Sequence, residues 1–289
     1  MTATLVWDGG CTLGEGPVWD AVGSVLWFVD IKKRHVHRYD PSTDSVEAWP
    51  APAQVGWVLP STDGRLLAGL QTGLATFDPA SGKFAALTAV EPSYPANRLN
   101  DATVGPDGTV WFGSMDDGES AITGRFYRWD GRRVVDAGID PVCITNGPGV
   151  SPDGRLLYHV DTLGGVIHVA DLDADGSVGT SRVFARIDPA DGHPDGVIVD
   201  SAGNVWLGLW GGWRARLYSP QGEILREVRL PVANVTKIAL GGDDLRTAYA
   251  TTASAGLDAA ALAGQPLAGG LFTFRVDVPG QRVLPAPIN

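Results

Sequence analysis

The chain has 289 residues, a formal net charge of −11, ten tryptophans, 38 glycines and 20 prolines. Its hydrophobic content of 44% supports a substantial core and excludes a disordered chain. No basic patch stands out from the acidic background, which argues against nucleic acid or an anionic membrane surface as a partner.

The beginning of the chain and its cysteines favour a cytoplasmic protein. Residues 1–8 have neither the basic region nor the long apolar stretch of a signal peptide. No run approaches the ~20 apolar residues of a transmembrane helix. The two cysteines, Cys11 and Cys143, are too few for a disulfide scaffold. We therefore expect a reduced, cytoplasmic protein that is a monomer or a weak oligomer.

A turn followed by a strand recurs six times, at intervals of about 40 to 50 residues. The copies lie at 22–27, 63–67, 107–111, 153–157, 202–206 and 243–249. Each repeat holds several short runs of β-branched and aromatic residues between turns; in the first repeat these are 16–19, 25–29, 35–39 and 45–49. Six such repeats predict an all-β fold, a six-bladed β-propeller with four-stranded antiparallel blades around a central channel, spanning 1–289 as a single domain.

A propeller must also close its ring. We expect the segment Thr4–Trp7 to pair with the last blade near Leu271–Arg275, so that the two ends of the chain share one blade. Helical periodicity is hard to find, and only 258–263 could form one or two helical turns.

Eight positions before the turn residue of each copy, the chain carries a column of mostly polar residues. The column reads Glu15, Gly56, Asn100, Asn146, Asp195 and Lys237. The first strand of a propeller blade lies nearest the axis, and the column falls at the end of that strand far from the turn. The second strand returns to the same height. We therefore expect these side chains to share one mouth of the channel, with Gly56 leaving open space among them.

Three members of the column are oxygen donors that suit a divalent cation. Glu15, Asn146 and Asp195 offer two carboxylates and an amide oxygen, a set suited to Ca²⁺, Mg²⁺ or Mn²⁺, with Zn²⁺ and Fe²⁺ also compatible. Without a cation, two neighbouring carboxylates would repel or take up a proton. Each segment alone could be an ordinary polar turn. Their common register in separate blades favours one metal site.

Other residues near the predicted mouth have two interpretations each. Arg98 lies two residues before Asn100 on the same side of the strand, where it could donate to substrate oxygens or form a salt bridge to Asp101 or a rim carboxylate. Lys237 could balance the carboxylates or contact a ligand. The acidic loop 115–120 could grip hydroxyl groups or be solvated.

Aromatic and histidine residues give weaker signals. Trp57, Trp210 and Trp213 could form a stacking wall for a ring, although propeller cores use many aromatic residues. His35 and His37 have the spacing of a metal pair, but they fall on a third strand, away from the axis, where a structural role is favoured.

At these positions the chain resembles the SMP-30/gluconolactonase/LRE family of six-bladed propellers, and within it the bacterial sugar-acid lactonases. The matching segments are 13–17, 97–101, 144–148, 194–196 and 268–272. By this resemblance Glu15, Asn146 and Asp195 would hold one divalent cation, and Asp195 would also serve as the acid/base residue.

The resemblance places the substrate beside the cation. Arg98 and Asn100 would contact the substrate, and family members often add an acidic residue from the loop that corresponds to 116–119. The position that corresponds to this acidic residue is Gly118, which stands between two acids. We expect the neighbouring Asp117 to be the substrate-binding residue.

The resemblance implies metal-assisted hydrolysis of a sugar lactone to the aldonic acid. The cation would polarise the carbonyl oxygen, and Asp195 or the cation would activate the attacking water. Pentonolactones such as xylonolactone or arabinolactone are favoured as substrates, and gluconolactone comes next. Two other functions stay open: a phosphotriesterase-like hydrolase that uses the same cation, and a non-enzymatic propeller in which the cation only rigidifies the channel.

Overall fold

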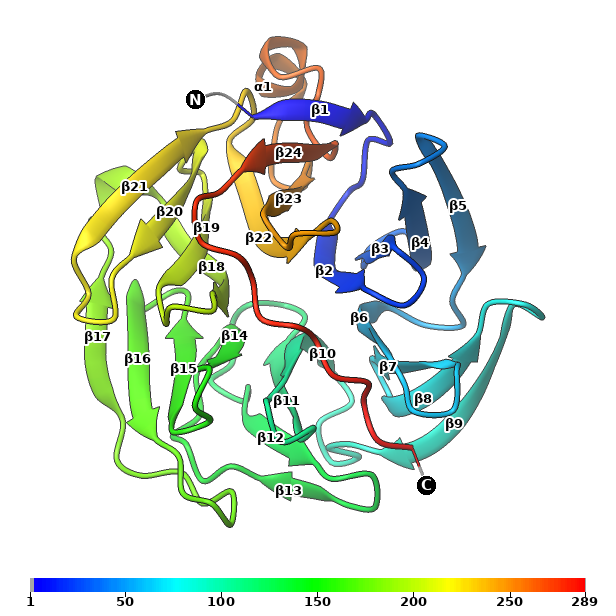
Figure 1. Ribbon diagram of the computed structural model, residues 1–289, viewed down its shortest axis with the longest axis vertical. Helices are drawn as coiled ribbons and strands as arrows, with labels where there is room; N and C mark the ends of the chain where they lie inside the picture. The colour runs from blue at the N-terminus through cyan, green and yellow to red at the C-terminus, as the bar shows by residue number, and fades with distance from the viewer. Residues whose placement is uncertain (1–2, 289) are drawn as a thin grey trace.

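The computed structural model describes residues 3–288; Met1, Thr2 and Asn289, the ends of the region predicted as one propeller domain, lie outside the described residues. The strands form six four-stranded antiparallel sheets, arranged as blades around one axis (Figure 1). The six-bladed β-propeller predicted from the repeat is confirmed.

Each blade is an antiparallel meander in which successive strands lie progressively farther from the axis. The innermost strands are β2 (Gly14–Asp20), β6 (Val55–Pro60), β10 (Asn97–Val104), β14 (Thr145–Val150), β18 (His193–Val199) and β22 (Asn234–Gly241). The second strands are β3 (Val25–Asp30), β7 (Leu66–Leu70), β11 (Val110–Asp116), β15 (Leu156–Asp161), β19 (Val205–Trp210) and β23 (Thr247–Ala253). The third strands are β4 (His35–Asp40), β8 (Gly73–Asp78), β12 (Phe126–Trp129), β16 (Val166–Asp171), β20 (Arg214–Tyr218) and β24 (Leu271–Arg275). The outer strands are β5 (Ser45–Pro50), β9 (Lys83–Ala89), β13 (Val134–Asp136), β17 (Arg182–Arg186), β21 (Ile224–Arg229) and β1 (Thr4–Trp7).

The turn between the first two strands of a blade has a repeated hydrogen-bonding basis. In the second, third and fourth copies the side chain of Asp63, Asp107 or Asp153 accepts from the backbone N–H two residues further on. The next residue, a glycine in each case, has a positive φ between 71° and 85°. These local turns set the phase of the repeat, so the position counted back from them is structurally equivalent in these blades.

The ring closes as predicted, by pairing of the two ends of the chain. β1 runs antiparallel to β24, with Thr4 opposite Thr273 and Leu5 opposite Phe272. Trp7 packs edge-on against Phe28 of the first blade, with ring centroids 5.4 Å apart. The first strand of the chain therefore joins the last blade to the first.

Deletion of residues 1–8 should lower the thermal midpoint of unfolding. The truncation removes the outer strand of the last blade and the packing of half-buried Leu5 and Trp7. We expect a decrease of roughly 10 °C in differential scanning calorimetry, since each lost kcal/mol shifts the midpoint of a domain this large by about 2–4 °C. An unchanged midpoint would contradict closure through β1.

The hydrophobic core lies between neighbouring blades. Its largest cluster joins the first three blades through residues such as Val29, Leu67 and Phe112, each fully shielded from solvent. Burial of these apolar faces provides the main drive for blade stacking. The polar column is thereby left to the axis, away from the apolar packing.

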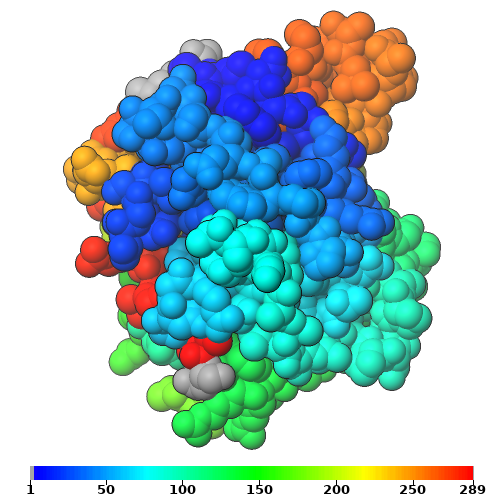
Figure 2. Space-filling model, turned by 90° about the vertical axis from the view of Figure 1, so that its right-hand side faces the viewer, coloured from blue at the N-terminus to red at the C-terminus, as the bar shows by residue number. Residues whose placement is uncertain are grey.

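The two faces of the ring differ. The short helix α1 (Ala259–Gly264), capped by Asp258, projects from one face, and the C-terminal segment 277–288 lies on the other (Figure 2). That segment crosses the axis (Figure 1) and is held there by the Gln281 amide, which donates to the carbonyls of Val150 (2.9 Å) and Val199 (3.0 Å). No helix within residues 3–288 has the length and apolar character needed to cross a bilayer.

Candidate active site at the channel mouth

The inner strand of every blade carries a β-bulge at or next to the column position. The strand-pairing register shifts between Glu15 and Val18, Val55 and Trp57, Leu99 and Ala102, Asn146 and Gly149, Pro194 and Val197, and Val235 and Ile238. A bulge leaves residues outside the ladder and re-aims side chains. The six bulges explain how buried polar residues on these strands leave the interblade core and face the axis.

Five predicted site residues line one pocket of about 340 Å³. They are Glu15, Arg98, Asn100, Asn146 and Asp195. Each is at least 94% shielded from solvent. Ala255 and Gly256, in the loop that leads to α1, also line this pocket, so the mouth opens on the face that carries the helix. The structure thus brings together the residues predicted to bind metal and substrate, whose roles stay predictions.

Gly56 does not leave open space in the column. A Cβ atom at this position would lie 2.4 Å from the carbonyl oxygen of Leu99 and 2.8 Å from that of Asn100. The backbone of the neighbouring inner strand approaches too closely for any side chain. That expectation was wrong because spacing along the chain does not reveal which backbone approaches a glycine.

Hydrogen bonds orient the two asparagine amides of the site. The Asn146 amide nitrogen donates to Thr162 Oγ1 at 2.9 Å, and its oxygen accepts from Asn100 Nδ2 at 3.0 Å. Asn100 Nδ2 also donates to the carbonyl of Thr145 at 2.6 Å, while its Oδ1 accepts from Arg98 Nη1 at 2.5 Å. The Asn146 oxygen is therefore turned toward Asn100, and its second lone pair is left for a ligand.

Glu15 and Asp195 form a buried pair of carboxyls. Burial raises the pKa of Glu15 to about 8, and the charge of Asp101 acts in the same direction. Burial also raises the pKa of Asp195 well above its usual range, and the charge of Glu15 adds to this shift. The Arg98 charge opposes both shifts. Further positive charge beside them would favour ionisation of both carboxyls.

The donor set fits a divalent cation. Nowhere within residues 3–288 do three or more histidine, cysteine or acidic side chains gather in a metal-binding arrangement, so a cation here would depend on the Asn146 amide oxygen as well as on two carboxylates. Oxygen donors with two negative charges match the preferences of hard divalent ions. Glu15, Asn146 and Asp195 are thus the residues that would hold the cation.

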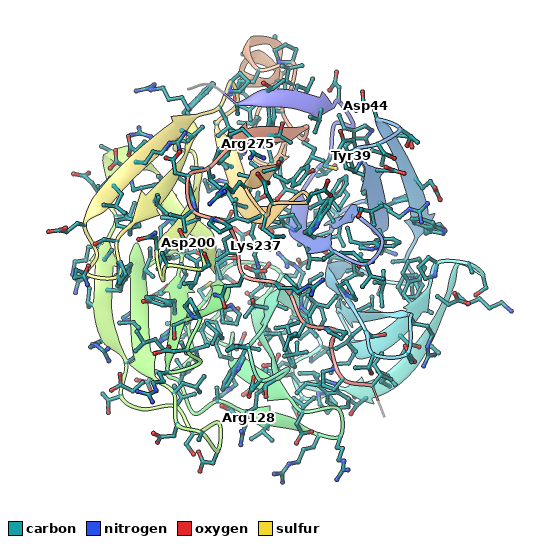
Figure 3. All side chains as sticks on the ribbon, in the orientation of Figure 1. Tyr39, Asp44, Arg128, Asp200, Lys237 and Arg275 are labelled. Atoms are coloured by element: carbon teal, nitrogen blue, oxygen red, sulfur yellow. The ribbon has the colours of Figure 1, made fainter. Side chains whose placement is uncertain are left out.

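Lys237, the last member of the column, does not line the mouth pocket and forms an ion pair beneath it. Its Nζ donates to Asp101 Oδ1 and, at 2.9 Å, to the carbonyl of Ala102, and it lies near the centre of the ring (Figure 3). Asp101 also accepts from the backbone N–H of Gly147 at 3.0 Å. Lys237 lines a second cavity of about 180 Å³, which Gln281 also lines, on the side of the C-terminal segment. This buried ion pair joins three blades beneath the mouth pocket.

Arg98 pairs with a rim carboxylate, one of the two alternatives to a substrate contact that the sequence left open. Its Nε donates to Asp117 Oδ1 at 2.8 Å. Lys32 Nζ donates to the same oxygen at 2.6 Å, and Gln54 Nε2 donates to Asp117 Oδ2 at 2.9 Å. Within the same loop it is Glu119, not Asp117, that lines the pocket. The substrate-binding role given to Asp117 stays a prediction.

Sequence reasoning named Arg98 but did not extend its offset to the other residues that lie two positions before the column and nearer the rim. Leu13, Ile144 and His193 line the pocket together with Arg98. Gln54 donates a hydrogen bond to Asp117 at the rim. Residues two apart on a strand face the same side. The offset that revealed Arg98 would therefore have revealed the other four. Lys32, in a turn between strands, has no such signal.

The aromatic and histidine candidates lie in different parts of the molecule. Trp210 lines the mouth pocket, and Trp57 is buried beside the second cavity, which Lys237 also lines. Trp213 is a surface residue, so the three do not form one wall. His37 stacks on Phe28 with ring centroids 4.9 Å apart, away from the pocket. The structural interpretation of the histidine pair agrees with this packing.

Comparison with known proteins places the chain in a family. The model of the SMP-30/Gluconolactonase/LRE-like region matches residues 13–254. The chain belongs to this family. The match begins two residues before Glu15 and includes every predicted site residue and four of the five short segments, and the resemblance to the family is confirmed.

Similar proteins cover nearly the whole chain. L-arabinolactonase of Azospirillum brasilense is 38% identical over 274 residues, which are 93% of this chain and 90% of that protein. 6-Deoxy-6-sulfogluconolactonase of Pseudomonas putida is 36% identical over 272 residues, 93% and 92% of the two chains. The crystal structure of a calcium-binding protein, regucalcin, from Agrobacterium tumefaciens superposes with a TM-score of 0.95 at 26% identity and covers 100% of this chain and 98% of its own.

Proposed function

We propose that this protein is a sugar lactonase that depends on one divalent cation bound by Glu15, Asn146 and Asp195. The observation that carries the proposal is the meeting of two buried carboxyls and an oriented amide oxygen beside Arg98 in one pocket. The lactonases among its relatives support sugar-lactone hydrolysis as the reaction. The regucalcin neighbour, described as calcium-binding, supports a divalent cation.

The residues of the pocket have different proposed roles in the reaction. Asp195 would accept the proton of the attacking water and return a proton to the ring oxygen as the ester bond breaks. Arg98 would donate to substrate oxygens, and Asn100 holds the Asn146 oxygen in place.

A bound cation supplies Lewis-acid polarisation of the lactone carbonyl and stabilises the negative charge of the tetrahedral transition state. Apolar side chains complete the pocket: Leu13, Met115, Ile144 and Trp210 line it above the polar floor. They restrict water around the reacting ester, which strengthens the electrostatic interactions of the site.

A pentonolactone is the proposed substrate, with gluconolactone next. The pocket volume of about 340 Å³ lies at the small end of ligand pockets, which suits a single sugar ring. The relative named for L-arabinolactone is 38% identical to this chain.

A panel assay tests this function. Hydrolysis of xylonolactone, arabinolactone, galactonolactone and gluconolactone would be followed by the fall in pH, each with Mg²⁺, Ca²⁺, Mn²⁺, Zn²⁺ or Fe²⁺ added to metal-stripped protein. We expect a pentonolactone to give the highest kcat/KM, at least about tenfold above paraoxon, since the pocket reads hydroxyl groups. Turnover of paraoxon alone would support the phosphotriesterase-like function instead. Metal-dependent stabilisation without any turnover would support the non-enzymatic propeller.

A further inference from the structure

The Arg98 guanidinium is held in one orientation by the protein itself. Nε donates to Asp117, and Nη1 donates to Asn100 Oδ1 at 2.5 Å and to the Leu99 carbonyl at 3.4 Å. Within the described part of the chain Nη2 has no hydrogen-bond partner, and Arg98 lines the pocket. Three of the five N–H donors are thus committed to protein acceptors, and the two on Nη2 are left for a ligand.

Protein donors occupy three of the about four acceptor sites of the Asp117 carboxylate. Its carboxylate accepts from Lys32, Gln54 and Arg98, and its backbone N–H donates to the carbonyl of Ala96 at 3.1 Å. Burial would raise the pKa of Asp117, but these donors outweigh burial and hold the pKa at about 2. Asp117 is also absent from the residues that line the pocket. A carboxylate in this state fixes its neighbours and has little capacity left to accept from a sugar hydroxyl.

The three donors to Asp117 come from different parts of the ring. Lys32 lies in the turn between β3 and β4 of the first blade, Gln54 directly precedes β6 of the second, and Arg98 lies on β10 of the third. The Asp117 loop therefore ties three adjacent blades together at one side of the mouth. A shift of this loop would turn the guanidinium away from the pocket, because Nε is its anchor on that side.

We infer that Asp117, itself held by Lys32 and Gln54, is a positioning residue that acts on the substrate only through Arg98. This inference rests on the proposed lactonase function and differs from a direct contact between Asp117 and the substrate. It assigns the orientation of Arg98 Nη2, and with it recognition of the substrate hydroxyls, to a carboxylate that does not itself line the pocket.

A double-mutant cycle separates the two roles. Asp117→Ala, Arg98→Met and the double variant would be compared with the wild type through kcat and KM for the best lactone of the panel. We expect Asp117→Ala to raise KM about tenfold and to change kcat less than about threefold, the signature of lost binding that is equal in ground and transition states. In the Arg98→Met background the same substitution should change KM by less than about twofold.

Two further variants make the cycle decisive. Asp117→Asn keeps one oxygen for Arg98 Nε, so its KM should rise only about threefold. This variant guards against misfolding of the alanine variant. Asp136→Ala removes the acidic partner of Arg125 on the same blade, 3.5 Å away and outside the pocket, and should leave KM unchanged. An Asp117→Ala effect as large in the Arg98→Met background as in the wild type would overturn the inference in favour of direct contact.

A binding measurement keeps the inference separate from the reaction. The same cycle would be measured as the Kd of xylonolactam, the cyclic amide that presents the hydroxyls of xylonolactone. If the wild type binds the lactam and hydrolyses no lactone, the proposed lactonase function fails while the coupling between Asp117 and Arg98 is still decided. Absence of both binding and hydrolysis would overturn both.

Discussion

Replacement of Asp195 by alanine should lower kcat/KM for the lactone by about 10³–10⁴-fold. The substitution removes one of two carboxylates from the donor set and removes the proposed proton acceptor in the same step. Asp195 is 94% shielded from solvent and lies in the pocket with Glu15 and Asn146. Initial rates from the pH-drop assay, together with metal content per chain, provide the measurement; both should fall.

Asp161→Asn is the matched control for this experiment. Asp161 ends the second strand of the fourth blade on the mouth side, where its side chain accepts from the backbone N–H of Gly164 at 3.0 Å and does not line the pocket. Its activity should stay within about twofold of the wild type. Asp195→Ala protein that hydrolyses the lactone at the wild-type rate would exclude Asp195 from the chemistry.

Lys237→Met should be among the most destabilising single substitutions in the chain. Asp101 is fully buried and Lys237 nearly so, and the two are joined by an ion pair beneath the pocket. Methionine has a similar length but leaves the Asp101 carboxylate without its counter-ion. Loss of one partner of a buried ion pair costs about 3–5 kcal/mol of the free energy of unfolding. The midpoint of urea unfolding measures this loss.

An exposed ion pair provides the comparison. Arg182 and Asp171 approach to 3.0 Å, but their side chains are 52% and 74% exposed, so Arg182→Met should cost less than about 1 kcal/mol. Adding Asp101→Asn to Lys237→Met removes the orphaned charge and should restore at least part of the loss. Equal stability of Lys237→Met and Arg182→Met proteins would contradict the structural role given to the pair.

The fold and the place of the site could be predicted because both depend on local, repeated chemistry. Aspartate–glycine turns such as Asp63-Gly64 set the phase in three of the blades, and counting back from the equivalent turn residue of every copy places Glu15, Asn146 and Asp195 in register. The same phase located the mouth, because residues at one height on inner strands converge on the axis of a closed ring.

The partners of the charged residues could not be predicted in the same way. Lys237 and Arg98 occupy column or rim positions, yet each has more than one carboxylate within reach, and the choice depends on distances across the channel. Lys237 pairs with Asp101, which leaves Arg98 to Asp117. The bulges and the close approach at Gly56 depend on how neighbouring backbones pack, which the order of residues along one chain does not display.

The most direct test of a cation-dependent lactonase is a titration of metal-stripped protein with the most effective cation. Bound metal per chain and the initial rate of lactone hydrolysis would be measured on the same samples. The proposed site predicts that the rate rises in proportion to bound metal, reaches its plateau at one cation per chain, and does not recover in Glu15→Gln protein. Full activity in the metal-stripped wild type would contradict the proposed mechanism.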